Sequence, residues 1–284
     1  MINLKIGYVK IRQAEGGIIN NIIYKINSVL NTVKQKNDIF GIIKLNDKTK
    51  KKIVNILRKN KIDYAIVEND EVINYPTLDG KYILKYMLPE IVDYCIKILK
   101  PKSEQIYICT NNYTSENNEL IEELAEKVKV VNIFTENAQY NQLEKNLEKK
   151  GIYITVSANK RKSLKKANIV INLDLKNLDD CNINRNMVFI DLNKNTPLPK
   201  AFNGIIIKKA EIDTKKVMRA FSDYENFNRS KIIEAEMLKL EGYKKSREFI
   251  KSNKLYIVNL KNNRAIDKDE FSRIGKIIQD TKKI

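Results

Sequence analysis

Polar side chains that follow short apolar runs are the first candidates for chemistry in this chain. Several such runs occur from residue 105 onward, and each has the length and the β-branched content of a buried strand. Because ligands bind outside the carboxyl ends of the strands in an open α/β sheet, the residues after each run should border one binding site. The candidate cofactor-binding residues are Thr110, Asn111, Asn112, Ser115, Glu136, Ser157, Asn172 and Asp191.

The loop after the first of these runs is the critical one. A dinucleotide-binding sheet carries G-x-G-x-x-G here, whereas this chain reads TNNYTS over 110–115, without a glycine. Hydroxyl and amide side chains at a helix N-terminus can hold an anion with the help of free backbone donors and the helix dipole. The same side chains also serve as ordinary N-caps, and both interpretations stay open.

Two other strand ends each carry two interpretations. Glu136 follows Thr110 by about 26 residues, where an acid that binds ribose would lie, but it could equally be a surface residue. Asp191 could face a ligand or close an Asx turn. The residues 172–174, at the end of a further run, complete the set of strand ends that should meet at the site.

Catalysis would have to use lysine, tyrosine, carboxylate or thiol groups, because the chain contains no histidine. This excludes a Ser-His-Asp triad and an HExxH zinc site. Asp79, Lys81 and Lys85 are the candidate catalytic residues, since a desolvated lysine beside a carboxylate can act as an acid or base. Charged residues at the start of a helix are the alternative interpretation.

The cysteines predict neither a disulfide framework nor a metal site. Cys95, Cys109 and Cys181 lie far apart, without a C-x-x-C pair, in or beside apolar stretches. Their pattern is typical of small buried hydrophobes. We therefore expect no metal.

The first hundred residues predict a small α/β domain over 1–80 and a connecting helix over 81–101. Strands are expected at 4–11, 40–45 and 64–68. A helix is expected from the three-to-four spacing of isoleucines over 18–33, although β-branched residues form helices poorly. Pro89 should either kink the connecting helix or begin a second one.

The remainder predicts a Rossmann-like domain over 102–212 and a C-terminal helical segment over 213–284 that packs back on the domains. Helices are expected at 214–226 and 230–251, followed by a strand at 255–260. A final helix should begin at a capping box formed by Asp267 and Glu270. The expected fold class is α/β: a small N-terminal α/β domain plus a Rossmann-like, doubly wound parallel sheet with C-terminal helices. The strands of that sheet are expected at 105–110, 129–135, 152–157, 167–174, 187–192 and 204–207.

The net charge and the apolar runs of the chain limit the kinds of binding partner that we expect. The net charge of +18 suggests nucleic acid, but the lysines are scattered and form only short clusters at 48–52, 160–166 and 244–247. Nucleic acid is therefore disfavoured as a partner. No apolar run approaches the roughly 20 residues of a membrane span, so we expect a cytoplasmic protein without a membrane partner. A homo-oligomer is compatible with these patterns.

The run KKANIVINLD over 165–174, followed by MVFIDLNKNTPLP and GIII, resembles the back half of the Rossmann domain in the shikimate dehydrogenase and glutamyl-tRNA reductase group. Methylenetetrahydrofolate dehydrogenases share this layout. The resemblance implies a nicotinamide cofactor, NAD(P), held between two domains, and redox chemistry on a small molecule.

Three functions follow as hypotheses. The first is a Rossmann-like protein that binds a nucleotide or a small anionic ligand between two domains, and that could retain NAD(P)-dependent oxidoreductase activity. The second is a non-catalytic binding or regulatory module that kept the fold and lost the cofactor. The third is a basic protein associated with nucleic acid.

Overall fold

The computed structural model describes residues 4–11, 24–28, 37–42, 47–101, 104–158, 164–178, 181–213 and 227–280. The chain divides into two compact units. The first unit contains residues 1–80 and 214–241, and the second contains residues 81–213 and 242–284.

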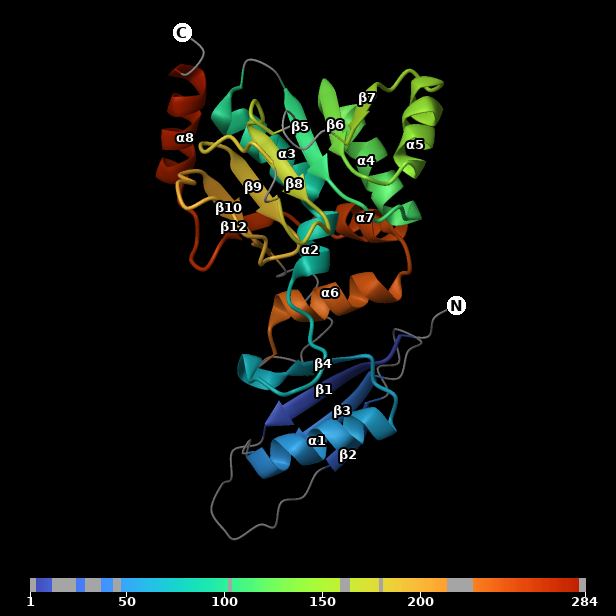
Figure 1. Cartoon of the computed structure of the whole chain (residues 1–284). Coiled ribbons are helices and arrows are strands. Elements are labelled where there is room, and N and C mark those ends of the chain that lie inside the picture. Colours follow the sequence, from blue (N-terminus) through green and yellow to red (C-terminus); the bar gives the residue numbers. More distant parts are fainter. Residues whose placement is uncertain are drawn as a thin grey trace. The chain divides into compact units, whose positions relative to one another are not determined.

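The first unit is built on a four-stranded mixed sheet with the strand order β2-β3-β1-β4 (Figure 1). Strand β1 (Ile6–Ile11) pairs in parallel with both β3 (Asn37–Ile42) and β4 (Tyr64–Val67). Helix α1 (Asp47–Lys59) contributes Ile53 and Leu57 to the core around β1 and β4, and a short 3-10 turn, η1 (Glu68–Asp70), follows β4. The expected small α/β fold is therefore present in this unit.

The helix expected over 18–33 is wrong where the structure describes that segment. Tyr24–Ser28 forms strand β2, which pairs antiparallel with β3. Isoleucine is β-branched and fits the pleated surface of a sheet better than a helix turn, so the sheet partner outweighs the helical spacing. Residues 12–23 and 29–36 lie outside the described part of the chain.

The second unit is built on a six-stranded parallel sheet with the strand order β10-β9-β8-β5-β6-β7. Counted from its own first strand, this is the order 6-5-4-1-2-3 of the doubly wound dinucleotide-binding fold. All four residues of β8 and of β9 are buried, as strands covered on both faces require. The expected doubly wound α/β sheet is confirmed. Its strands are β5 (Gln105–Cys109), β6 (Val130–Phe134), β7 (Ile154–Ser157), β8 (Ile169–Asn172), β9 (Val188–Asp191) and β10 (Ile205–Ile207).

Helices flank this sheet (Figure 1). Helix α4 (Ser115–Lys127) connects β5 to β6, and α5 (Gln139–Glu148) connects β6 to β7. The connecting segment forms two helices, α2 (Lys81–Tyr86) and α3 (Leu88–Leu99), and Pro89 lies in the first turn of the second. Proline suits that position because the first helical N–H groups have no partner inside the helix. Pro89 thus begins a second helix, one of the two expected outcomes.

The C-terminal segment departs from the expected pattern in two places. The single helix expected over 230–251 is wrong: α6 (Arg229–Lys239) ends before α7 (Tyr243–Ser252) begins. The break lies at Glu241 and Gly242, whose φ angles of 49° and 125° no helix accommodates. Strand β11 (Lys209–Ile212), which sequence patterning did not predict, pairs antiparallel with β12 (Ile257–Lys261).

The two helices around that break belong to different units. Helix α6 packs on the first unit, where Ile232 and Ala235 meet Ile6 and Tyr8, and α7 belongs to the second. The last helix, α8 (Lys268–Asp280), also belongs to the second unit and begins as expected, with the Glu270 N–H donating to the Asp267 carboxylate at 2.7 Å. The helix expected over 214–226 lies outside the described residues. Within the described ranges, no helix combines the length and apolarity needed to cross a membrane.

Candidate functional site

The candidate site lies at the switch point of the six-stranded sheet, where the strand order reverses between β5 and β8. A cavity of about 380 Å³ opens there, a size typical of small-molecule sites. Its walls come from the loops after β5, β6 and β8. It is lined by Asn111, Asn112, Phe134, Glu136, Asp174, Leu175, Lys176, Asn177, Leu178 and Cys181.

The carboxylate of Asp174 occupies the donors of the loop after β5. Its Oδ2 accepts from the Thr110 hydroxyl at 2.5 Å and from the Asn112 N–H at 3.3 Å. Its Oδ1 accepts from the Asn111 N–H at 2.7 Å. In a dinucleotide-binding sheet, the loop after the first strand lies against the pyrophosphate. Here a side chain of the protein supplies the negative charge.

The other side of this loop is fastened to helices α4 and α5. Thr114 caps α4 by accepting from the Asn117 N–H at 3.1 Å, so the N-cap interpretation of this hydroxyl-rich loop holds for Thr114. The Asn112 carbonyl accepts from the Asn117 amide and from the Tyr140 hydroxyl, both at 2.8 Å. Burial raises the pKa of Tyr140. The loop is therefore held closed by its own side chains and by Asp174.

Asn111 connects the ends of β5 and β6. Its side-chain oxygen accepts from the Glu136 N–H at 2.8 Å and from the Thr135 hydroxyl at 3.2 Å. Its carbonyl accepts from the Asn137 amide at 2.9 Å. These contacts place the exposed Glu136 on the rim of the cavity, beside the loop that Asp174 closes. Glu136 is the residue that the sequence suggested as an acid that binds ribose.

Asn172 and Asp191 come together in a buried network beside the cavity and line neither it nor the second cavity described below. Both residues are fully buried. The Asn172 amide donates to Asp191 at 3.2 Å and to the Thr196 hydroxyl at 2.7 Å. Asp191 also accepts from the Thr196 hydroxyl, the Thr196 N–H and the Asn193 N–H, which closes an Asx turn. These contacts brace the ends of β8 and β9.

A second cavity of about 380 Å³ also has Asp174 in its lining. Lys81 and Lys85, two of the candidate catalytic residues, line it, and Ser115 lines it from the start of α4. The Lys85 side chain is 12% exposed, and its ammonium donates to Glu116 at 2.9 Å. Asn112 and Asp174 line both cavities.

Two sequence candidates lie away from these cavities. Asp79 is exposed and belongs to the first unit, whereas Lys81 and Lys85 belong to the second. Ser157 ends β7, where its carbonyl accepts from the Thr135 N–H at 3.1 Å, and it lines neither cavity. The other cofactor-binding candidates lie in the loops that border the cavities or in the network beside them.

The cavity is also lined by residues that were not among the candidates expected from the sequence. Asp174, Lys176 and Cys181 all follow β8, on the 173–187 connection to β9. The signal for Asp174 was present, since 172–174 ends the strand that neighbours β5 at the switch point. Cys181 is half-buried and Cys109 is fully buried, so Cys181 is the more accessible of these two thiols. Burial raises the pKa of Cys109, with Cys181 and Asp174 as further causes.

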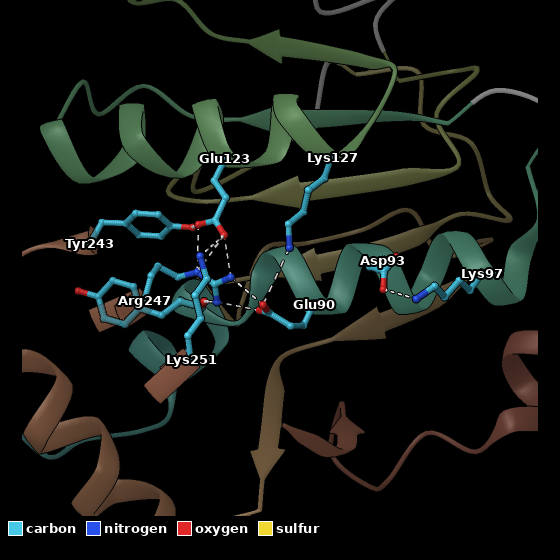
Figure 2. Close-up of polar contacts among 9 residues, drawn as sticks. Glu90, Asp93, Lys97, Glu123, Lys127, Tyr243, Arg247 and Lys251 are labelled. Atoms are coloured by element: carbon cyan, nitrogen blue, oxygen red, sulfur yellow. Dashed lines mark hydrogen bonds and ion pairs between the residues drawn. The ribbon is translucent and has the colours of Figure 1, made fainter. Parts of the chain in front are cut away.

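A third cavity, of about 330 Å³, is lined in part by Glu123, Tyr243 and Arg247. These residues belong to a charge cluster that joins α3, α4 and α7 around the buried Arg247 (Figure 2). Arg247 is 3% exposed and donates to both oxygens of Glu90 and of Glu123 over 2.6–3.2 Å. It also donates to the Tyr86 carbonyl at 2.8 Å, and the Tyr243 hydroxyl donates to Glu123 at 2.6 Å. The cluster fastens α7 to the sheet-covering helices. Arg247, in the third basic cluster of the sequence, is thus buried in ion pairs.

From this charge cluster we predict that the free energy of unfolding falls in acid. Burial alone would raise the pKa of Glu123, but hydrogen bonds from Arg247 and Tyr243 outweigh it and lower that pKa below its ordinary value. A lowered folded-state pKa contributes stability above the unfolded pKa, and this contribution is lost as the pH falls through the folded pKa. Urea unfolding at pH 7 and at about pH 3 should therefore show a larger loss for the wild type than for Arg247→Met. Equal losses would contradict this role of Glu123.

No group of His, Cys, Asp and Glu side chains among the described residues is arranged to hold a metal ion. The basic residues 160–162 lie outside the described part of the chain.

Comparison with known proteins adds little to this geometry. Neither a family model nor a curated protein matches the chain. Among solved structures, the chain is similar to a putative aspartate carbamoyltransferase from Trypanosoma cruzi at 10% identity, over 69% of this chain and 71% of that one. The TM-score is 0.25, so this likeness carries no argument about function. What stands is a parallel-sheet α/β fold with a closed loop and a cavity at its switch point.

Proposed function

We propose that the chain is a small-molecule-binding protein whose switch-point cavity takes the nucleoside part of its ligand. One observation carries this proposal: the cavity lies at the carboxyl ends of β5, β6 and β8, in a sheet with the dinucleotide-binding strand order. Ligands of open α/β sheets bind at this place. Glu136 stands on the rim after the second strand, where a carboxylate accepts hydrogen bonds from ribose hydroxyls.

The lining of the cavity supports a nucleoside. Phe134, Leu175 and Leu178 offer an apolar wall for a base, and Asn111, Asn112 and Asn177 add polar amide groups. Small-molecule sites commonly combine apolar walls with a few polar groups that fix orientation. The cavity contains two acidic side chains, Glu136 and Asp174, and one basic side chain, Lys176. This balance favours a neutral or cationic ligand over a polyanion.

An NAD(P)-dependent oxidoreductase is the second candidate. It is favoured by Lys81 and Lys85, which line a cavity that shares Asp174 with the first. The ammonium of Lys85 already donates to Glu116, and the loop after β5 already holds a carboxylate. Binding without redox chemistry is therefore the better supported function. Titration with NADPH beside adenosine separates the two.

Cys181 provides a direct test of ligand binding. It is half-buried and lines the cavity, whereas Cys95 and Cys109 are 0% exposed, and burial raises the pKa of Cys95 to about 12. A maleimide should therefore modify Cys181 first in the folded protein. Adenosine at ten times its Kd should slow that modification about tenfold, because it occupies the cavity that the thiol lines.

The labelled residue is identified by peptide mass spectrometry, and Cys181→Ser is the control that should remove the fast reaction. An unchanged labelling rate in saturating adenosine would overturn the proposed nucleoside site.

A further inference from the structure

We infer that Asp174 is a built-in anion that fills the phosphate position of this loop and makes the cavity selective for ligands without a phosphate. The inference deepens the proposed function by naming the class of ligand: a nucleoside or a related neutral or cationic molecule, and not a nucleotide. The part that concerns Asp174 and its donors rests on geometry alone.

The contacts of Asp174 are those that a bound phosphate would make. Two successive backbone N–H groups, of Asn111 and Asn112, and one buried hydroxyl, of Thr110, converge on a single carboxylate. Successive backbone N–H groups in a loop form anion-binding concavities. Hydrogen bonds to an ionised acceptor are stronger than neutral ones, so this carboxylate competes well for the loop donors.

A phosphate could reach these donors only by displacing Asp174. Displacement would leave the carboxylate beside the incoming phosphate and near Glu136, with Lys176 as the basic side chain that lines this cavity. Like charges that line one cavity disfavour each other, and the displaced carboxylate loses the hydrogen bonds that the loop donors gave it. A neutral nucleoside avoids both costs because it leaves Asp174 in place.

Removal of Asp174 should therefore create an anion site. The substitution releases the loop donors from Asp174. In the lining of the second cavity, Lys81 and Lys85 then remain as basic side chains and Glu116 as the acidic one. The balance of formal charge around that cavity changes from two acidic and two basic side chains to one acidic and two basic ones. Both changes favour a bound phosphate.

The test measures thermal unfolding of the full chain in inorganic phosphate and in chloride at equal ionic strength. Asp174→Ala should have a lower Tm than the wild type in chloride and should regain several degrees in phosphate, since a ligand that binds only the folded state raises Tm. The wild type should gain nothing specific from phosphate. Asp93→Ala is the matched control: it removes an exposed carboxylate of the same unit, paired with Lys97, away from the loop (Figure 2).

Two results would overturn the inference. One is a gain of Tm in phosphate that is equal for the wild type and Asp174→Ala, and the other is no gain in either. If the alanine variant fails to fold, Asp174→Ser takes its place, with the same expected gain. The affinities of Asp174→Ser for AMP and for adenosine are then measured by protection of Cys181. The ratio of the AMP affinity to the adenosine affinity should be at least about tenfold higher in this variant than in the wild type.

The inference and the proposed function fail differently. Inorganic phosphate contains no nucleoside, so a gain of Tm in Asp174→Ala supports the role of Asp174 even if adenosine does not protect Cys181. Conversely, protection by adenosine together with equal protection by AMP in the wild type would leave the nucleoside site standing and remove Asp174 as its selector.

Discussion

Replacement of Arg247 by Met is expected to lower the free energy of unfolding by about 3–5 kcal/mol. The substitution leaves Glu90 and Glu123, and the Tyr86 carbonyl, without the guanidinium that joins them. A buried ion pair contributes little net stability when it is complete, but removal of one partner is costly. Without Arg247, the two carboxylates keep only the longer ion pairs of Glu90 with Lys127, at 4.0 Å, and of Glu123 with Lys251, at 3.8 Å. The effect is therefore large even though the cluster itself need not be strongly stabilising.

The measurement is urea unfolding at pH 7 with Arg264→Met as the matched control. Arg264 is 85% exposed and pairs with Glu270, so its removal should cost at most about 1 kcal/mol. The triple variant Arg247→Met, Glu90→Gln and Glu123→Gln should recover part of the loss, because it removes the stranded charges together. A loss for Arg247→Met as small as that for Arg264→Met would contradict the buried cluster.

Replacement of Asp191 by Ala is expected to cost about 3 kcal/mol of unfolding free energy and to leave ligand binding intact. Asp191 is fully buried and accepts hydrogen bonds from two backbone N–H groups, from the Thr196 hydroxyl and from the Asn172 amide. Each buried donor left unsatisfied costs about 1–3 kcal/mol, and relaxation of the loop offsets part of the sum. Asp191→Asn keeps one acceptor oxygen and should lose less.

This prediction separates a structural role from the binding role that the sequence suggested for Asp191. Chemical unfolding measures the first, and adenosine protection of Cys181 under folding conditions measures the second. Asp93→Ala, an exposed carboxylate, should change stability by no more than about 0.5 kcal/mol. A small loss of stability combined with a large loss of protection would identify Asp191 as a ligand contact after all.

The sheet that positions the site could be predicted from the sequence because its strands are short, apolar and separated by helices. Residues such as 105–110 and 187–192 leave few alternatives to a buried strand, and they became β5 and β9 within a residue or two. The first unit was harder to predict, because isoleucine spacing over 18–33 fits a helix and β-branching fits a strand. Strand β2 formed where a sheet partner, β3, was available.

The chemistry of the site could be predicted only in part. The loop 110–115 and Glu136 were predicted to border a site because strand ends meet at one edge of a parallel sheet. The closure of that loop depends on Asp174, which is 63 residues away from Asn111 in the sequence. No local sequence pattern predicts which acidic side chain at the switch point will accept hydrogen bonds from the loop after β5. The same holds for Arg247, whose partner Glu90 is 157 residues distant.

Calorimetric titration of the wild-type chain with adenosine, AMP and NADPH shows whether the switch-point cavity binds a nucleoside and excludes a phosphate. We expect saturable binding of adenosine, with binding of AMP and NADPH at least about tenfold weaker, a difference of about 1.4 kcal/mol. Tighter binding of NADPH than of adenosine would contradict it, because the ligand would then have displaced Asp174 from the loop.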